Sequence, residues 1–147
     1  KTNKKFDLIL IKQTIHLLKM QEIKKLLNLC KSRLKCKGKI IIFTLNPRQN
    51  EIPTFFLMEK KLKISFKRDQ KIIKFISKIF SKKISKKFIF TVNISKKKYL
   101  EMIKNRYIST LLKFSPREIL KGVDEINLRY KKVLKFKDKL QCIIIKN

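Results

Sequence analysis

The chain begins with a basic leader and a nearly continuous apolar run. Residues 6–11 (FDLILI) follow the leader, and a run of this kind is typical of a strand that is buried on both faces. We therefore expect a central strand. Apolar residues then recur with helical spacing over residues 20–37, which predicts a helix that ends at Gly38, where a left-handed backbone costs little. The buried stripe of this helix comprises Ile23, Leu26, Leu27, Cys30 and Leu34.

A second strand is predicted directly after this helix. Residues 39–44 are rich in β-branched side chains, and Asn46 and Pro47 are suited to the turn that ends the strand. The order strand, helix, strand, with both strands apolar, is typical of a crossover in a parallel sheet that helices cover. The sequence thus predicts an α/β fold with a mostly parallel sheet flanked by helices.

The middle of the chain has a less regular pattern. Residues 52–66 contain Pro53 and mix apolar with basic side chains, which favours a loop with a short helix. Asp69 is suited to cap a following helix, and residues 88–94 are expected to form a third strand, preceded by a lysine tract. The stripe of the helix after Asp69 comprises Ile72, Ile73, Ile76, Ile79 and Phe80.

Two helix starts and a last strand are predicted in the final third. Ser95 can cap one helix, whose buried face would hold Tyr99, Met102, Ile103 and Arg106 or Tyr107. Ser115, Pro116 and Glu118 form a capping-box signature, which predicts a helix start. Residues 140–145 are expected to be the last strand, and the absence of repeats and Gly/Ser linkers predicts one domain over residues 1–147. The buried stripe of the helix that starts after Ser115 comprises Ile119, Leu120, Val123, Ile126 and Tyr130.

Charge narrows the classes of partner. The 147 residues include 40 Lys and Arg against 10 Asp and Glu, a formal net charge of +30 that attracts polyanions such as RNA, DNA or anionic lipid. Lysine outnumbers arginine 34 to six, a balance that A- and T-rich codons also produce, so codon usage supplies part of the charge.

The apolar runs are far shorter than the roughly 18 to 20 residues that cross a bilayer, which argues against a transmembrane segment. No secretory signal precedes the first strand, and three cysteines are too few for a disulfide scaffold. We expect an intracellular protein of the cytoplasm or of an organelle (mitochondrion or plastid) that is not secreted. The chain begins at Lys1 and not at Met, which indicates a sequence that is trimmed, processed or incomplete.

Three stretches carry a family resemblance. They are residues 6–16 (FDLILIKQTIH), residues 34–44 with a single glycine, Gly38, before the strand, and residues 99–111 (YLEMIKNRYISTL) with the Phe114-Ser115, Glu118-Ile119, Gly122 and Glu125-Ile126 that follow. Together they resemble the carboxyl-terminal half of a class I S-adenosylmethionine-dependent methyltransferase of type 11. Residues 6–11 would be the fourth strand of that family and residues 39–44 its fifth.

The resemblance implies a cofactor site that these residues do not complete. The family holds S-adenosylmethionine with a glycine-rich turn after its first strand and an acidic residue after its second, whereas this chain has only Gly38 and Gly122 and no Gly-x-Gly. We expect S-adenosylmethionine as cofactor if an amino-terminal half exists, and neither cofactor nor activity for this chain alone. The alternative is a non-catalytic, methyltransferase-like RNA-binding subunit of a ribosome or organellar ribonucleoprotein. In either case, the missing half or a protein partner would pair with the open sheet edge.

Candidate site residues lie after the predicted strands. His16, the only histidine, can orient an acceptor or act as a base, or it can be a packing residue. The residues expected beside it, as pocket lining or as partners of loop backbone, are Lys12, Gln13, Thr44 and Asn46. Within the third family-like stretch, the candidates for binding an anionic acceptor group, with packing as the alternative, are Arg106, Tyr107, Ser109 and Thr110.

The candidates for contact with a polyanion are basic tracts of the chain. The lysine tracts either contact phosphates or form solvated faces that codon bias produced. They comprise Lys60, Lys61, Lys63, Lys67 and Arg68, then Lys82, Lys83, Lys86 and Lys87, then Lys96, Lys97 and Lys98. No metal site is expected, because Cys30 and Cys36 lack the spacing and the additional ligands of a zinc site.

Overall fold

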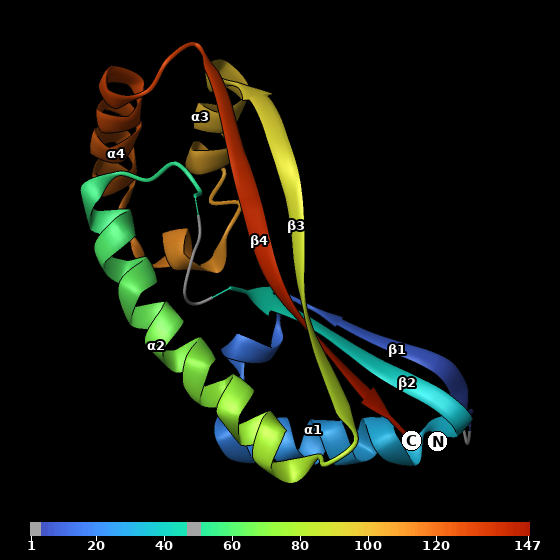
Figure 1. The fold of residues 1–147 in the computed structure, drawn as a ribbon. Coiled ribbons are helices and arrows are strands. Elements are labelled where there is room, and N and C mark those ends of the chain that lie inside the picture. Colours follow the sequence, from blue (N-terminus) through green and yellow to red (C-terminus); the bar gives the residue numbers. More distant parts are fainter. Residues whose placement is uncertain (1–3, 47–50) are drawn as a thin grey trace. The chain divides into compact units, whose positions relative to one another are not determined.

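A computed structural model describes residues 4–46 and 51–147 of the chain (Figure 1). These residues divide into two compact units, which are described separately. The first unit contains residues 4–46, 68–88 and 139–147, and the second contains residues 51–67 and 89–138. The single domain that the sequence predicts stays a prediction. The elements are β1 (Phe6–Lys12), a 3-10 turn η1 (Ile15–Leu17), α1 (Met20–Ser32), β2 (Leu34–Leu45), α2 (Phe56–Ile79), β3 (Lys83–Ser95), α3 (Lys96–Lys104), a 3-10 turn η2 (Ser109–Lys113), α4 (Pro116–Arg129) and β4 (Val133–Lys146).

The sheet is mixed and has the strand order β1-β2-β4-β3. β1 pairs with β2 in parallel, as predicted, with Ile11 opposite Ile42. β2 pairs with β4 in antiparallel, with Ile42 also opposite Ile143. The prediction of a mostly parallel sheet is therefore wrong in this respect. The last strand, β4, runs antiparallel to β2. The sequence could not predict this, because an apolar run does not show the direction of a strand.

β1 is an edge strand of the sheet that the structure describes, not a central one. It pairs only with β2, and Leu8 and Leu10 are 52% and 55% exposed. Ile11 on the opposite face is buried. The apolar run correctly predicted a strand, but it could not show whether neighbours cover both faces. The open edge that the sequence analysis expected is present along β1.

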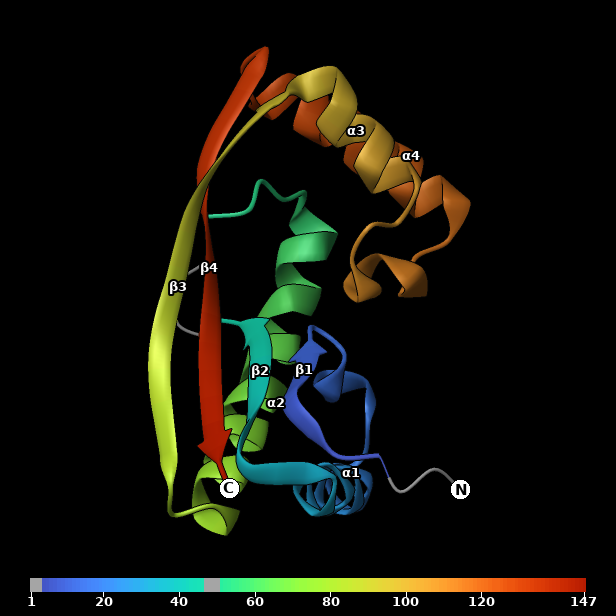
Figure 2. The same cartoon turned by 90° about the vertical axis from the view of Figure 1, so that its right-hand side faces the viewer.

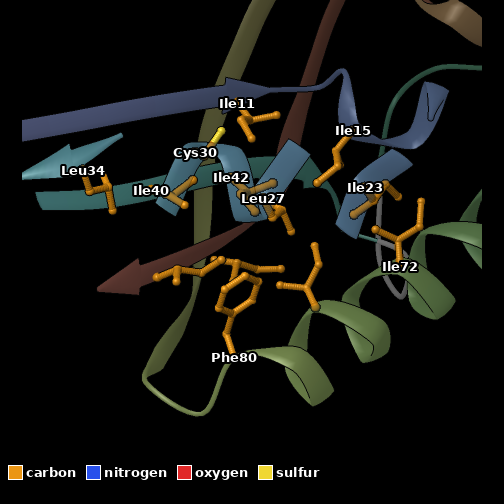
Figure 3. Packing of buried hydrophobic residues seen from close by; sticks show 13 residues of the cluster. Ile11, Ile15, Ile23, Leu27, Cys30, Leu34, Ile40, Ile42, Ile72 and Phe80 are labelled. Carbon is orange, nitrogen blue, oxygen red and sulfur yellow. The ribbon is translucent and has the colours of Figure 1, made fainter. Parts of the chain in front are cut away.

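The core of the first unit lies between one face of the sheet and two helices (Figure 3). Ile40 and Ile42 from β2 and Ile143 and Ile145 from β4 pack with the predicted stripes of α1 and of the carboxyl-terminal half of α2. The predicted stripe residues Ile23, Leu27, Cys30 and Leu34 are buried, and Leu26 is partly buried against the same cluster.

Two predicted boundaries in this unit are wrong. α1 ends at Ser32, and Gly38 lies inside β2, not at a helix end. Its lack of a side chain matters for close packing, because a Cβ there would lie 2.9 Å from the carbonyl oxygen of Phe6. β3 begins at Lys83, so that Lys86 and Lys87 belong to the strand. Pro47, expected in the turn after β2, lies outside the described residues.

α2 is one helix of 24 residues that begins at Phe56, whereas the sequence predicted a loop with a short helix over residues 52–66 and a separate helix after Asp69. Met58 and Leu62 are buried with helical spacing, but lysines surround them in the sequence and conceal the stripe. Asp69 lies inside this helix and does not cap it.

The second unit contains α3 and α4, which pack side by side (Figures 1 and 2). Ser95 caps α3 by accepting from the amide of Lys98, and Ser115 and Glu118 form the predicted capping box of α4. Ile119, Val123 and Ile126 are buried as expected, whereas Leu120 is exposed. β4 begins at Val133, before the predicted strand. Gly122 lies against the ring of Phe55.

Candidate functional site

Buried polar side chains gather at the carboxyl end of β2. Among the described residues, the buried polar or charged ones are Thr44, Asn46 and Asp69, which are 3%, 5% and 5% exposed. Thr44 and Asn46 continue the alternation of Ile40 and Ile42 and therefore lie on the face of β2 that the helices cover. Asp69 is on the part of α2 that packs against this face. The hydroxyl of Thr44 donates to the carboxylate of Asp69.

The end of β1 adds residues to the same region. Gln13 has a left-handed backbone, with φ of 52°, and its amide donates to the carbonyl of Phe43 at 2.8 Å. The chain turns there into η1, which carries His16. The carboxyl ends of parallel strands lie side by side at one end of the sheet, and open α/β sheets bind ligands at this end. The structure thus places the predicted residues Gln13, His16, Thr44 and Asn46 at one edge, together with an exposed Lys12.

Arg68 connects α2 to η1. Its Nη2 donates to the carbonyl of Leu18 at 2.9 Å, and its charge acts on His16. Burial, and then the positive charge of Arg68, hold the pKa of His16 below its usual value of 6.5. At pH 7 the imidazole is therefore neutral and can accept a proton. In the sequence, Arg68 belongs to a basic tract that is a candidate for polyanion contact, and no local pattern connects it with His16.

Asp69 is the site residue that sequence reasoning missed. Burial raises its pKa to about 6, although Arg68 and the hydroxyl of Thr44 act in the opposite direction. A signal was present in the sequence, because Asp69 precedes Ile72 by three residues and Ile76 by seven. This spacing places Asp69 on the buried stripe of the helix.

The second group of candidates belongs to the second unit. Nη1 of Arg106 donates to the carbonyl oxygens of Leu111 and Phe114, the latter at 2.5 Å, and the residue has a φ of 54°. The guanidinium thereby holds the carboxyl-terminal part of η2, which contains Ser109 and Thr110 nearer its start. Anion binding by these residues stays a prediction, because the described contacts of Arg106 are with backbone.

Tyr107 takes part in a hydrogen-bonded pair of phenols. Its hydroxyl lies 3.2 Å from that of Tyr99, which donates to the carbonyl of Pro53 at 2.6 Å. Burial raises the pKa of Tyr107 to about 12 and also raises the pKa of Tyr99. Both phenols therefore stay protonated and act as hydrogen-bond donors at neutral pH.

The lysine tracts have mixed surroundings. Nζ of Lys83 donates to the carbonyls of Ser77 and Phe80 at the end of α2, and Nζ of Lys96 donates to those of Asn127 and Tyr130 at the end of α4. Lys63 forms a salt bridge with Glu59 at 2.8 Å. The remaining lysines of the predicted tracts are exposed, and their contact with a polyanion stays a prediction.

Within residues 4–46 and 51–147, no group of three or more potential metal ligands is close enough to hold an ion. No helix among these residues is long and apolar enough to cross a membrane. Cys30 and Cys142 are buried and Cys36 is exposed, and all three are free thiols.

Comparison with solved structures gives matches to methyltransferases. The plantazolicin methyltransferase BpumL, in complex with a monoazolic desmethylPZN analog and SAH, matches with 16% identity and a TM-score of 0.41 over 100% of this chain and 54% of its own. A proposed methyltransferase from Bacillus halodurans C-125 matches with 13% identity and a TM-score of 0.47 over 99% of this chain and 66% of its own. This chain is similar to such methyltransferases and spans about half to two thirds of their length. No protein-family model and no curated protein sequence match it.

The described residues do not fit the cofactor of such enzymes. Gly38 lies within β2 and Gly122 within α4, and in this part of the chain no glycine-rich turn follows a strand. The backbone approach that a nucleotide-type cofactor needs is therefore not provided here.

Proposed function

We propose that the chain forms the acceptor-side part of an S-adenosylmethionine-dependent methyltransferase. The family resemblance of residues 6–16 and 99–111 indicates the reaction class. The observation that carries the proposal lies in the first unit. It is the polar cluster of His16, Thr44 and Asp69 at the carboxyl ends of the parallel strands β1 and β2. Ligands of open α/β sheets bind at this position.

The cluster can supply orientation and proton transfer. A neutral His16 beside Arg68 can accept the proton that an N–H or O–H acceptor loses. The exposed Lys12 and the half-buried Gln13 can hold a polar acceptor against the sheet edge. Positioning of this kind accounts for a large part of the rate enhancement in reactions between two bound molecules. The cofactor would be held by residues other than those described, so no step through it is assigned to this chain.

Calorimetry of the protein, purified from its own cells, with S-adenosylmethionine tests the reaction class. Binding in the micromolar range supports the proposal, and no binding contradicts it. Salt-sensitive binding of RNA in place of the cofactor would favour the ribonucleoprotein alternative, because phosphate contacts release counterions.

The role of His16 needs a second measurement. Transfer of a radioactive methyl group to the RNA, protein and small-molecule fractions of the cell should fall about a hundredfold in His16→Asn, which is the usual effect of losing a general base. Asp124→Asn, which changes an exposed residue on α4, is the matched control and should retain activity. Equal activity of His16→Asn and the control would remove His16 from the mechanism.

A further inference from the structure

The turn from α4 to β4 lies beside the junction of β3 with α3 in the second unit (Figures 1 and 2). The amide of Lys96 donates to the carbonyl of Lys132 at 2.8 Å. Nζ of Lys96 also donates to the carbonyls of Asn127 and Tyr130, at 2.8 and 3.1 Å, where the last carbonyls of α4 need partners. Hydrogen bonds from one lysine therefore fix the turn against the start of α3.

Two aliphatic side chains of this turn are largely exposed. Leu128, in the last helical turn of α4, is 88% exposed, and Val133, the first residue of β4, is 59% exposed. Leu128 has the largest exposed fraction among the large hydrophobic side chains of the described residues. A single exposed leucine is common in proteins, so the residues around these two decide what they can contact.

The residues around them are mostly lysines. Residues 95–98 and 127–133 contain six Lys or Arg and no Asp or Glu. Each of the residues that define the basic tip is exposed, and they are Lys97, Lys98, Leu128, Lys131, Lys132 and Val133. The tip thus combines four positive charges with two apolar side chains on a turn that is held in place.

A partner of the tip must offer negative charge and also accept aliphatic side chains. Single-stranded nucleic acid stacks its bases on exposed aromatic rings. The ring in this turn is that of Tyr130, which is partly buried, with the guanidinium of Arg129 5.9 Å from its centroid and its hydroxyl bonded to the backbone of Thr54. Duplex nucleic acid offers phosphates but no apolar layer for Leu128 and Val133. The surface of an anionic bilayer offers both, because phosphate headgroups lie directly above the acyl chains.

We infer that the basic tip attaches the protein to the surface of a membrane that contains anionic phospholipid. Leu128 and Val133 would enter the boundary between headgroups and acyl chains, and the four lysines of the tip would lie beside lipid phosphates. The inference does not depend on the proposed methyl transfer. The tip belongs to the second unit, whereas the polar cluster of His16 and Asp69 belongs to the first.

Sedimentation with lipid vesicles tests the attachment. The protein, purified from its own cells, should bind vesicles of phosphatidylglycerol and phosphatidylcholine in equal parts at about 0.15 M salt. It should bind vesicles of phosphatidylcholine alone at least tenfold more weakly, because these carry no net charge. The anionic vesicles should also slow hydrogen exchange in residues 130–133. Absence of binding to the anionic vesicles would overturn the inference, including the case in which another part of the native protein covers the tip.

The apolar contribution is tested by removing both aliphatic side chains. Leu128→Ser combined with Val133→Ser should weaken vesicle binding about tenfold or more, since neither side chain then becomes buried in the membrane. Both side chains are exposed, so we expect the double variant to fold. Leu120→Ser changes a side chain on the same helix that is 55% exposed and lies outside the tip, and it should leave binding unchanged. Equal binding by the double variant and this control would overturn the inference.

The charge contribution needs a control for net charge. Lys131→Glu combined with Lys132→Glu should weaken binding at least tenfold, because each lysine near an anionic surface contributes about fivefold. Lys24→Glu combined with Lys25→Glu changes an exposed adjacent pair on α1, lowers the formal net charge of +30 by the same amount and should retain most of the binding. Equal losses in the two variants would show that net charge alone drives binding and would overturn the inference. Binding of RNA through the same residues, without binding of vesicles, would also overturn it.

Discussion

The hydroxyl of Thr44 near the end of β2 donates a hydrogen bond to the carboxylate of Asp69 on α2, and both side chains are at least 95% buried. The bond joins the sheet to the helix at the edge where we propose that an acceptor binds. A buried carboxylate favours its neutral form, and a hydroxyl donor favours its charged form. The balance at Asp69 is therefore sensitive to both residues.

The raised pKa of Asp69 makes stability depend on pH. Its pKa is about 6 in the folded chain against 3.8 as the ordinary value, so the folded state holds the proton more tightly. The stabilisation from this group is present in full below pH 4 and is lost as the pH rises through 6. In chemical denaturation, the free energy of unfolding of the wild type relative to Asp69→Asn should fall by about 2 kcal/mol between pH 4 and pH 7.

The matched control for this measurement is Asp124→Asn, because Asp124 is exposed on α4. This variant measures the effect of removing a carboxylate at an exposed position, and the pH response of Asp69→Asn should exceed it. An equal pH response of the two variants would show that Asp69 is ionised normally in the folded chain.

Removal of the Thr44 hydroxyl should expose the cost of the buried charge. Thr44→Val keeps the shape of the side chain but leaves the carboxylate without this donor, so we expect a loss of about 1–3 kcal/mol at pH 7. At pH 4, where Asp69 is neutral, the loss should be smaller. In the double variant Thr44→Val with Asp69→Ala, the two effects should not add, because each substitution removes one partner of the same bond. Additive losses at pH 7 would contradict the hydrogen bond.

His16 can be titrated directly, because it is the only histidine of the chain. Its ring signals in NMR should give a pKa below 6.5, owing to burial and to the charge of Arg68. Arg68→Gln should raise this pKa, whereas Arg68→Lys keeps the charge and should leave it low. Since the folded pKa is the lower one, the contribution of His16 to stability is present above pH 6.5 and is lost as the pH falls through the folded value. A pKa at or above 6.5 in the wild type would contradict both the burial of the ring and its assignment as a base.

The sequence predicted the parts of the fold that depend on local periodicity. The stripes of Ile23 and Leu27 and of Ile72 and Ile76 are buried, and the capping box at Ser115 begins α4. Each of these signals depends only on residues that are close together in the sequence. The number of neighbours around a strand is a long-range property, and for this reason the apolar run of β1 was misassigned to the sheet centre.

The candidate site was partly predictable for the same reason. His16 follows β1 and Thr44 lies near the carboxyl end of β2, and the carboxyl ends of parallel strands lie side by side in a sheet. Asp69 was interpreted as a helix cap because aspartate is common at helix starts, although its spacing from Ile72 already placed it on the buried stripe. Arg106 bonds to backbone five and eight residues later, and this contact depends on the path of a loop that no periodic pattern encodes.

Loss of the predicted helix cap should have a measurable cost. Ser115 accepts from the amide of Glu118, whose carboxylate accepts from the amide of Ser115 at 2.7 Å. Ser115→Ala removes one half of this exchange and should lower the free energy of unfolding by about 1 kcal/mol. Ser115→Asp restores an acceptor at the cap and should recover most of the loss. Alanine and aspartate variants of equal stability would show that the capping box contributes little.

The second glycine is required for packing, not for a turn. A Cβ at position 122 on α4 would lie 2.6 Å from ring atoms of Phe55, which is 1% exposed and therefore has little room to move. Gly122→Ala gains up to about 1 kcal/mol in helix propensity, but the overpacking costs about 1–3 kcal/mol, so we expect a net loss of up to about 2 kcal/mol in the free energy of unfolding. Phe55→Leu in the same chain should relieve part of this loss. Asn127→Ala, at an exposed position of the same helix, has the propensity gain without the clash and should be neutral or stabilising. A stabilised Gly122→Ala variant would show that the ring of Phe55 does not lie against α4.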